Sequence, residues 1–256
     1  MNPAARATAT PPRSRPGLGA GIAALGDGIG FVVGNPRLWG YAAFPLVVAA
    51  ALTLTLSWLG VAEAASLASS WMGTAAHGID AALAWALRAV LTVAAVVTAY
   101  LVAFSLAQPL SGWALDAIVR SYEASVGLAA RPREPALAVA VRALKVSLIS
   151  LAVGLPLVAG LTVVGLLVPA AAVVTLPLKF VVSAILVAWD LLDYPLGRRG
   201  LGVGARLRWF GAHMGAVLGF GSFASVVLFI PCAGLLLLPV GVAGATALVV
   251  RAERAI

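Results

Sequence analysis

The feature that most constrains this chain is a run of 42 consecutive residues without a charged side chain, from Trp209 to Val250. A membrane-crossing helix needs about 20 apolar residues, so the run is about twice the length of one crossing. It begins after Arg208 and ends at Arg251, and basic residues collect on the cytoplasmic side of a membrane. Both ends are therefore predicted to lie on one side. We expect a hairpin of two helices that turns near Pro231 and Gly234 and either crosses the bilayer twice or enters partway and returns.

Composition identifies the class of protein. Hydrophobic residues make up 62% of the 256 residues and charged residues 10%, whereas a soluble domain carries about a quarter charged residues. The net charge of +8 would suit a nucleic-acid partner, but the arginines lie at the ends of apolar runs and not on one face with aromatic residues. We therefore predict an all-α integral membrane protein that binds no nucleic acid. The abundance of Ala, Gly, Val, Leu and Arg, with two Lys, favours a GC-rich bacterial genome.

The first half of the chain is predicted to hold a tail, a surface helix and two crossings. Residues 1–16 are rich in Pro, Ala, Thr and Arg and are expected to be a disordered, basic, cytoplasmic tail, with 17–256 forming a single α-helical membrane domain. Gly17–Val33 is expected to be either an interfacial helix or a flexible lead-in. The apolar face of that helix would consist of Leu18, Ile22, Leu25, Ile29 and Val32. Leu38–Ala62 and Ala89–Leu115 are uncharged and long enough to cross the membrane.

The charge pattern around those crossings sets the sides of the remaining segments. Glu63–Arg88 has few basic residues, which suits the non-cytoplasmic side, with or without a short surface helix. Asp116–Lys145 holds five basic residues and is predicted to be cytoplasmic. Val146–Trp189 is apolar apart from Lys179, is interrupted by prolines and precedes another basic loop. We expect a second hairpin of even passes that turns near Gly165–Pro169, so that both chain termini are cytoplasmic.

Charges inside or beside apolar runs are the candidates for function. Arg37 follows Asn35 and Pro36, which suit an N-cap and a first helical position. The free N–H groups of a helix start and one cation would form an oxyanion pocket, and the alternative is an arginine that only anchors the cytoplasmic side. Lys179 would either extend to the interface or line a polar path for an anion.

Two acids near a helix end complete the charged candidates. Asp190 and Asp193 lie three residues apart, where the helix dipole disfavours acids, so they are predicted either to be solvated or to pair with arginines. The candidate partners are Arg198, Arg199, Arg206 and Arg208. The histidines and the single cysteine are far apart in sequence, so we expect no metal site and no disulfide. Because paired carboxylates, a catalytic triad and a phosphate-binding loop are missing from the sequence, we predict no enzyme activity and no cofactor.

Several short motifs resemble those of one family in their order and spacing. They are Gln108-Pro109 with Gly112 and Asp116, Asp193-Tyr194-Pro195, Phe220-Gly221, Ile230-Pro231, Leu238-Pro239-Val240 and Gly244-Ala245-Thr246-Ala247, with Pro36 and Pro45-Leu46 at the first crossing. Over about residues 17–252 the chain resembles the CysZ family of bacterial inner-membrane sulfate transporters, related to the etoposide-induced membrane proteins of eukaryotes. The resemblance implies two full transmembrane helices plus two Pro/Gly-broken hairpins that penetrate partway, in a homo-oligomer that admits sulfate to the cell.

The resemblance also bears on the site residues. Family members with a sulfate site carry Gly, an aliphatic residue and Arg after the first-helix Pro, whereas the matching positions here hold Arg37, Leu38 and Trp39. We expect an anion site at Asn35, Arg37 and Leu38. The polar residues expected to line a pathway or support the structure are Asp116, Lys179, Asp190 and Asp193. The predicted function is passive or gradient-coupled transport of a small oxyanion, sulfate first, and the alternative is a membrane-organising scaffold protein without transport activity.

Overall fold

The computed structural model describes residues 16–72, 78–132, 135–228, 230 and 233–255, and its regular elements there are all helices. They are α1 (Leu18–Val33), η1 (Pro36–Leu38), α2 (Trp39–Met72), α3 (Gly78–Leu110), α4 (Gly112–Ser125), α5 (Ala136–Leu167), η2 (Pro169–Ala171), α6 (Ala172–Gly197), α7 (Val203–Ala212), α8 (Met214–Leu228) and α9 (Ala233–Arg254). The predicted all-α class is confirmed for this part of the chain. Nearly all of the predicted disordered tail lies outside the described residues.

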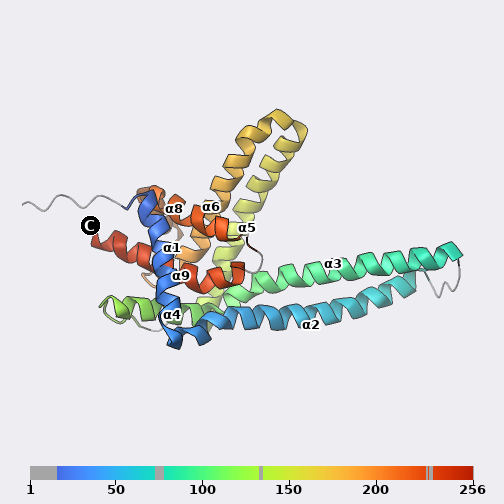
Figure 1. The fold of residues 1–256 in the computed structure, drawn as a ribbon, viewed down its shortest axis with the longest axis horizontal. Coiled ribbons are helices and arrows are strands. Elements are labelled where there is room, and N and C mark those ends of the chain that lie inside the picture. The colour runs from blue at the N-terminus through green and yellow to red at the C-terminus, as the bar shows by residue number, and fades with distance from the viewer. Residues whose placement is uncertain (1–15, 73–77, 133–134, 229, 231–232, 256) are drawn as a thin grey trace, which may run out of the picture.

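Two long helical hairpins project from a compact body (Figure 1). α2 and α3 lie side by side along one hairpin and α5 and α6 along the other, and the hairpins point in different directions. The body consists of α1, α4, α8 and α9 around the inner end of α6. Among the described residues, five helical segments are long and apolar enough to cross a membrane, or up to six if the bent pair α7–α8 forms one span.

The α2–α3 hairpin is longer than the two predicted crossings. α2 continues through Glu63 to Met72 and α3 begins at Gly78, so much of the stretch expected between the crossings is helical. The segment after Glu63 is rich in Ala and lacks Gly and Pro, which favours helix, and Ser69 Oγ donates to Ser66 O at 2.8 Å. The 34 residues of α2 extend about 50 Å, whereas the hydrocarbon core of a bilayer is about 30 Å thick. The hairpin is therefore longer than the hydrocarbon core is thick.

The α5–α6 hairpin turns where the sequence predicts. α5 ends at Leu167, and η2 leads the chain directly into α6, which agrees with a turn near Gly165–Pro169. The end of this hairpin is apolar and exposed: Leu166 is 75% exposed and Val173 is 79% exposed. Because exposed apolar surface of this extent is unfavourable in water, this end differs in kind from the polar end of the α2–α3 hairpin.

α1 is helical, as predicted, and its predicted apolar face divides into buried residues, Leu25 and Val32, and exposed ones. Its buried residues are Gly21, Ala24, Leu25, Gly28 and Val32, and the exposed ones include Leu18, Ile22 and Ile29. A Cβ on Gly21 would lie 2.1 Å from the carbonyl oxygen of Ala216 in α8. A Cβ on Gly28 would lie 2.3 Å from the carbonyl oxygen of Val240 in α9. Small residues let helix backbones approach closely, so α1 packs through its glycines together with Leu25 and Val32, and its other bulky side chains point outward.

The uncharged run from Trp209 to Val250 is more than a simple two-helix hairpin. α7 and α8 meet at a bend of 95°, and α9 follows after residues 229–232, of which only Ile230 is described. In α9, 72% of the most apolar stretch is buried inside the protein, where it packs on α1, α4 and α6. The run therefore contains two apolar helices, α8 and α9, as predicted, but other helices cover most of α9. The predicted turn residue Pro231 lies outside the described residues.

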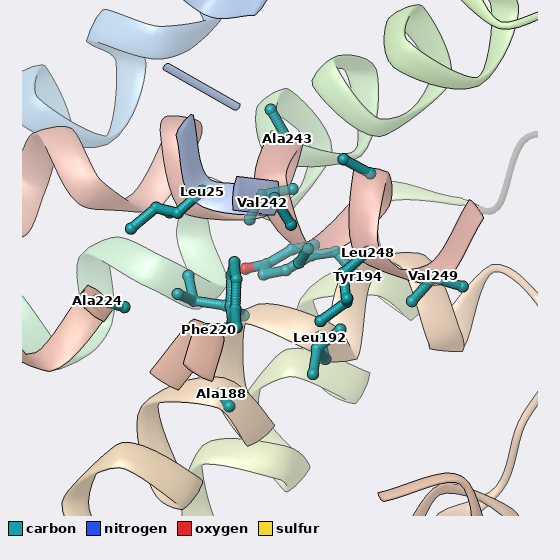
Figure 2. Close-up of a cluster of buried hydrophobic side chains, with 14 of the residues drawn as sticks. Leu25, Ala188, Leu192, Tyr194, Phe220, Ala224, Val242, Ala243, Leu248 and Val249 are labelled. Carbon is teal, nitrogen blue, oxygen red and sulfur yellow. The ribbon is translucent and has the colours of Figure 1, made fainter. Parts of the chain in front are cut away.

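A cluster of buried side chains fixes the inner end of α6 within the body (Figure 2). Tyr194, near the end of α6, is 1% exposed and lies among side chains that include Leu25 of α1 and Phe220 of α8. Gly221 lets α8 approach α6, because a Cβ there would meet the carbonyl oxygen of Ala184 at 2.0 Å. Helices from distant parts of the sequence, α1 and α8 among them, therefore fix the position of the residues that follow Tyr194.

Candidate functional site

Buried charges gather at the inner ends of α4, α6 and α9. The helix is interrupted at Ser111, as Pro109 and Gly112 predict, and α4 then carries Asp116 and Glu123 into the body. Both acids are almost wholly buried, at 2% and 4% exposed. An isolated ionised carboxylate is very unfavourable in a protein interior, so both acids require cationic partners.

Arg198 is the partner that the two acids share. It follows the last residue of α6, and its side chain is buried. Its Nη1 donates to Asp116 Oδ1 at 3.0 Å and its Nε donates to Glu123 Oε2 at 3.3 Å. The two acids lie seven residues apart on one face of α4, so one planar guanidinium joins both carboxylates. Arg120, one turn after Asp116, makes a further ion pair with it.

Arg199 extends the charged network to α9. Its Nη1 donates to Glu123 Oε1 at 3.1 Å and to Pro195 O at 2.8 Å, and its Nη2 donates to Glu253 Oε2 at 2.8 Å. Arg131 Nη1 lies 3.4 Å from Glu123 Oε1, so Glu123 contacts three arginines. The charged network thus joins four arginines to three carboxylates, Asp116, Glu123 and Glu253, and its described members carry one surplus positive charge.

A second buried ion pair lies at the same end of α6. Asp193 is 2% exposed and pairs with Arg206 of α7, and Arg142 Nε of α5 lies 3.7 Å from Asp193 Oδ2. Arg206 Nε also donates to Leu201 O at 2.8 Å. Arg206 is one of the four partners predicted for Asp193, so that pairing is confirmed. The pair ties α5, α6 and α7 together beside the charged network.

Burial affects the energetics of these ion pairs and the pKa of a neighbouring tyrosine. Removal of one member of a buried ion pair costs about 3–5 kcal/mol, because the other charge stays buried without its partner. Tyr122, also on α4, contacts Phe31 of α1 with ring centroids 4.8 Å apart. Burial, and then the negative charge of Asp27, raise the pKa of Tyr122 above its ordinary value. Tyr122 therefore stays a neutral phenol on the helix that carries Asp116 and Glu123.

A cavity of about 180 Å³ opens beside the charged network. Its polar lining consists of Arg120, Arg131, Arg198 and Glu123, and small or apolar residues at 124 and 128–130 complete it. A water molecule occupies about 30 Å³ of liquid, so the cavity has room for a small anion. Guanidinium groups present planar N–H donors that match the oxygens of carboxylates and phosphates. The arrangement can therefore hold an oxyanion through charge-assisted hydrogen bonds.

The predicted anion-site residues lie at the junction of α1 and α2. Asn35 occupies the N-cap of η1, as predicted, but its side chain donates to Phe31 O at 2.6 Å and makes no capping hydrogen bond. Leu38 is buried, and its N–H donates to Asn35 O at 2.9 Å. Arg37 is exposed and forms no ion pair with any residue that the structure describes. The Arg37 guanidinium is thus free to contact a ligand, whereas the Asn35 amide and the Leu38 N–H are engaged within the chain.

Lys179 and Asp190 are the other charged candidates on α6. Asp190 accepts a hydrogen bond from Ser150 of α5 at 2.8 Å, so its described partner is a hydroxyl and not one of the predicted arginines. Lys179 is half-buried and lines a groove between α6 and α8. The structure brings Asp116 and Asp193 to the charged end of the body, and Lys179 lies about 20 Å from Asp193 along the helix.

Sequence reasoning missed two acids and three arginines of this region. The residues that were not among the predicted site residues or partners are Glu123, Glu253, Arg120, Arg131 and Arg142. The arginines after α6 were considered only as partners of Asp190 and Asp193. One signal pointed to Glu123: it lies seven residues after Asp116, a spacing that places two residues on one face of a helix.

The structure gives no cluster of three or more His, Cys, Asp or Glu side chains suited to a metal ion within its described ranges. His213 stacks on Trp209 with ring centroids 4.5 Å apart, and its Nδ1 lies 2.9 Å from Trp209 O. His77 and Cys232 lie outside the described residues.

The fold and the site define a multi-pass α-helical membrane protein with buried arginines and carboxylates gathered at one end. The family model described as sulfate transporter CysZ/etoposide-induced protein 2.4 matches residues 24–239. The chain therefore belongs to the sulfate transporter CysZ/etoposide-induced protein 2.4 family, in agreement with the resemblance of its motifs.

Curated relatives match a shorter part of the chain. A sulfate transporter CysZ from Pseudomonas paraeruginosa (strain DSM 24068 / PA7) is 35% identical over 86 residues, which are 34% of this chain and 35% of the relative. A sulfate transporter CysZ from Pseudomonas aeruginosa (strain LESB58) is 34% identical over 86 residues, with the same shares of both chains. The chain thus aligns with about a third of the length of these relatives.

Proposed function

We propose that this chain is a passive or gradient-coupled transporter that brings a small oxyanion, sulfate first, into a bacterial cell across the inner membrane. The observation that carries the proposal is the arginine-lined cavity beside a charged network with a surplus positive charge. Membership of a family that includes sulfate transporters supports the choice of solute. The transporter works as a homo-oligomer, without a cofactor and without a catalytic step.

The carboxylates of the charged network explain how the cavity can both bind and release an anion. Asp116 and Glu123 hold the guanidinium groups of Arg120, Arg131 and Arg198 in position when no anion is present. An incoming oxyanion competes with these carboxylates for the same N–H donors. Binding is therefore weaker than it would be to unpaired arginines, and conduction requires binding that is weak enough for release.

The polarity of the hairpin ends supports an orientation in the membrane. The arginine-rich end of the body faces the cytoplasm together with both termini, because basic segments collect there. The α2–α3 hairpin crosses the bilayer fully and presents its polar end on the far side. The α5–α6 hairpin penetrates partway, because its apolar, exposed end is favourable only within hydrocarbon.

Arg37 is the second proposed contact for the anion, near the cytoplasmic face. Its exposure and its lack of an ion pair among the described residues support this role. Asn35 and Leu38 position it: the Asn35 side chain binds the end of α1, and the buried Leu38 side chain holds η1 against the body.

Uptake of radiolabelled sulfate into proteoliposomes that contain the full chain tests the proposal. Arg131→Gln and Arg37→Ala are each expected to lower the initial rate about tenfold, as expected for the loss of one charge-assisted contact. Arg208→Gln is the matched control, because Arg208 is exposed and does not line the cavity, and it should keep the wild-type rate. Size-exclusion chromatography checks that each variant is folded.

The outcomes separate the two functional hypotheses. If the wild-type protein takes up neither sulfate nor related oxyanions above the level of empty vesicles, transport is excluded and the scaffold alternative is favoured. If uptake occurs and Arg131→Gln leaves the rate unchanged, the cavity is not on the pathway.

A further inference from the structure

A groove in the apolar part of the protein has the features of a ligand site. It lies between α6 and α8 and has a volume of about 370 Å³, within the range of pockets that hold small ligands. Its polar lining consists of Lys179 and Ser183 from α6 and Ser225 from α8. Apolar side chains such as Leu176 and Phe180 form much of the remaining wall.

Two of the polar groups in this groove lack partners within the described part of the chain. Ser225 is 6% exposed, and its buried Oγ makes no hydrogen bond there. Lys179 forms no ion pair with a described residue. A buried hydroxyl without a partner and an ammonium group beside apolar walls are both unfavourable. An anionic group with oxygen acceptors, seated in the groove, would satisfy both of them.

The position of Lys179 along the hairpin indicates where such an anion comes from. Lys179 lies ten residues after the start of η2, which is about 15 Å along the helix. The hydrocarbon core is about 30 Å thick, so half of it is also about 15 Å. If the α5–α6 hairpin reaches the middle of the bilayer, as in the proposed partial penetration, Lys179 lies at the level of the cytoplasmic headgroups. That leaflet carries the anionic lipids.

The walls of the groove favour an amphiphile over a hydrated inorganic ion. The groove borders exposed apolar surface, with Leu176 61% exposed and Val226 51% exposed. An acyl chain can lie along such walls, whereas sulfate would lose its hydration there for one cation and two hydroxyls. We propose that this groove binds an anionic phospholipid, with the phosphate at Lys179, Ser183 and Ser225 and one acyl chain along the apolar wall. The inference rests on the proposed topology but not on the transported solute.

Photolabelling in proteoliposomes tests this assignment. The full chain is reconstituted with traces of phosphatidylglycerol or phosphatidylcholine that carry a diazirine in one acyl chain, and labelled peptides are located by mass spectrometry. The phosphatidylglycerol probe should label the segment 176–187 about tenfold more than the phosphatidylcholine probe, in line with one charge-assisted contact. Lys179→Gln should remove this preference, and Ser225→Ala should reduce it about threefold, in line with one neutral hydrogen bond.

The chain provides a matched control and clear contrary results. Lys145 is the other lysine, is exposed on α5 and does not line the groove, so Lys145→Gln should keep the preference. Equal labelling by both probes, or an unchanged preference in Lys179→Gln, overturns the assignment. Absence of labelling of this segment by either probe does so as well, because no acyl chain then lies along the groove. Sulfate uptake by Lys179→Gln, measured in parallel, separates this inference from transport: lost uptake with unchanged labelling assigns Lys179 to the anion path instead.

Discussion

The close packing of α1 on α9 predicts that a single added methyl group destabilises the protein. A Cβ at Gly28 would lie 2.3 Å from Val240 O and 2.5 Å from Gly244 N, whereas ordinary contact begins at 3.4 Å. Both neighbours are backbone atoms, which cannot rotate away, so Gly28→Ala must move α1 from α9 by about 1 Å. A gap of about 0.5–1 Å removes about a quarter to a half of the dispersion attraction of each contact. We expect the free energy of unfolding to fall by about 1–3 kcal/mol.

Gly26→Ala is the control for this substitution. Gly26 lies two residues earlier on the same helix, is exposed, and has no heavy atom within 4 Å of an added Cβ. Because Gly in a helix is about 0.5–1 kcal/mol less favourable than Ala, this variant should be more stable than the wild type by up to that amount. The two variants add the same methyl group to the same helix, so opposite changes in the free energy of unfolding isolate the effect of the contact with α9.

Unfolding in mixed micelles measures both effects. The purified chain is titrated with sodium dodecyl sulfate, helix content is followed by circular dichroism, and the free energies of unfolding are compared among the wild type and the two variants. Thermal melts in a mild detergent should give the same order, with Gly28→Ala lowest. If Gly28→Ala unfolds with a free energy equal to or above that of Gly26→Ala, α1 and α9 do not meet at the distance described.

Three further expectations concern buried charge, membrane depth and a surface ion pair. Arg198→Met leaves two buried carboxylates without one of their cationic partners, so the free energy of unfolding should fall by about 3–5 kcal/mol in the same titration. The control Arg208→Met changes an exposed residue and should lower it by less than about 0.5 kcal/mol. Equal losses in the two variants would contradict the charged network. In a chain whose native cysteine is replaced, Leu166→Cys should resist an impermeant maleimide while Ser69→Cys reacts with it from the far side. Strong labelling of the Leu166→Cys protein would rule out partial penetration. Asp27→Asn breaks a half-exposed pair with α9 and should cost less than about 1 kcal/mol, so a loss above about 2 kcal/mol would show that the pair is buried in the membrane-embedded protein.

The lengths of the uncharged runs and the placement of proline and glycine were sufficient to predict most of the helical architecture. The α5–α6 hairpin turns near Gly165–Pro169, and the helix breaks at Ser111, next to Pro109 and Gly112. Pro156 and Pro177 lie inside helices, so a proline did not mark a break at every position. Helix ends were less well predicted. The first crossing was expected over Leu38–Ala62, and the helix that contains it, α2, continues beyond Glu63 to Met72, since a single charge in an Ala-rich segment does not terminate a helix.

The buried face of α1 illustrates what hydrophobic periodicity does not reveal. Of the face that periodicity selects, Leu25 and Val32 are buried, whereas Leu18, Ile22 and Ile29 are exposed. The helix also buries Gly21 and Gly28, which periodicity does not select, because helices within membranes associate through close backbone contact between small residues. Which of the many glycines in this chain make such contacts depends on helices distant in the sequence, and one sequence does not supply that information.

The candidate site was predicted only where a local rule applied. Asp193 was expected to pair with an arginine because an acid at a helix C-terminus is unfavourable, and it pairs with Arg206. The same rule was wrong about a partner for Asp190, which accepts from Ser150 of the neighbouring helix. Glu123 was missed, because an acid in a basic segment has the same sequence pattern whether it is solvated or holds three arginines.

In the proposed topology, the two hairpins should also be inserted into the membrane in different ways. The end of the α2–α3 hairpin contains Glu63 and several hydroxyl side chains, and these groups need a translocation channel to carry them through the hydrocarbon. From Val163 to Val174 the other hairpin contains only apolar residues and glycine. No hydrated group has to be moved when this end sinks into the lipid. The α5–α6 hairpin can therefore enter the bilayer after the body has folded, from the side on which the ribosome delivered it.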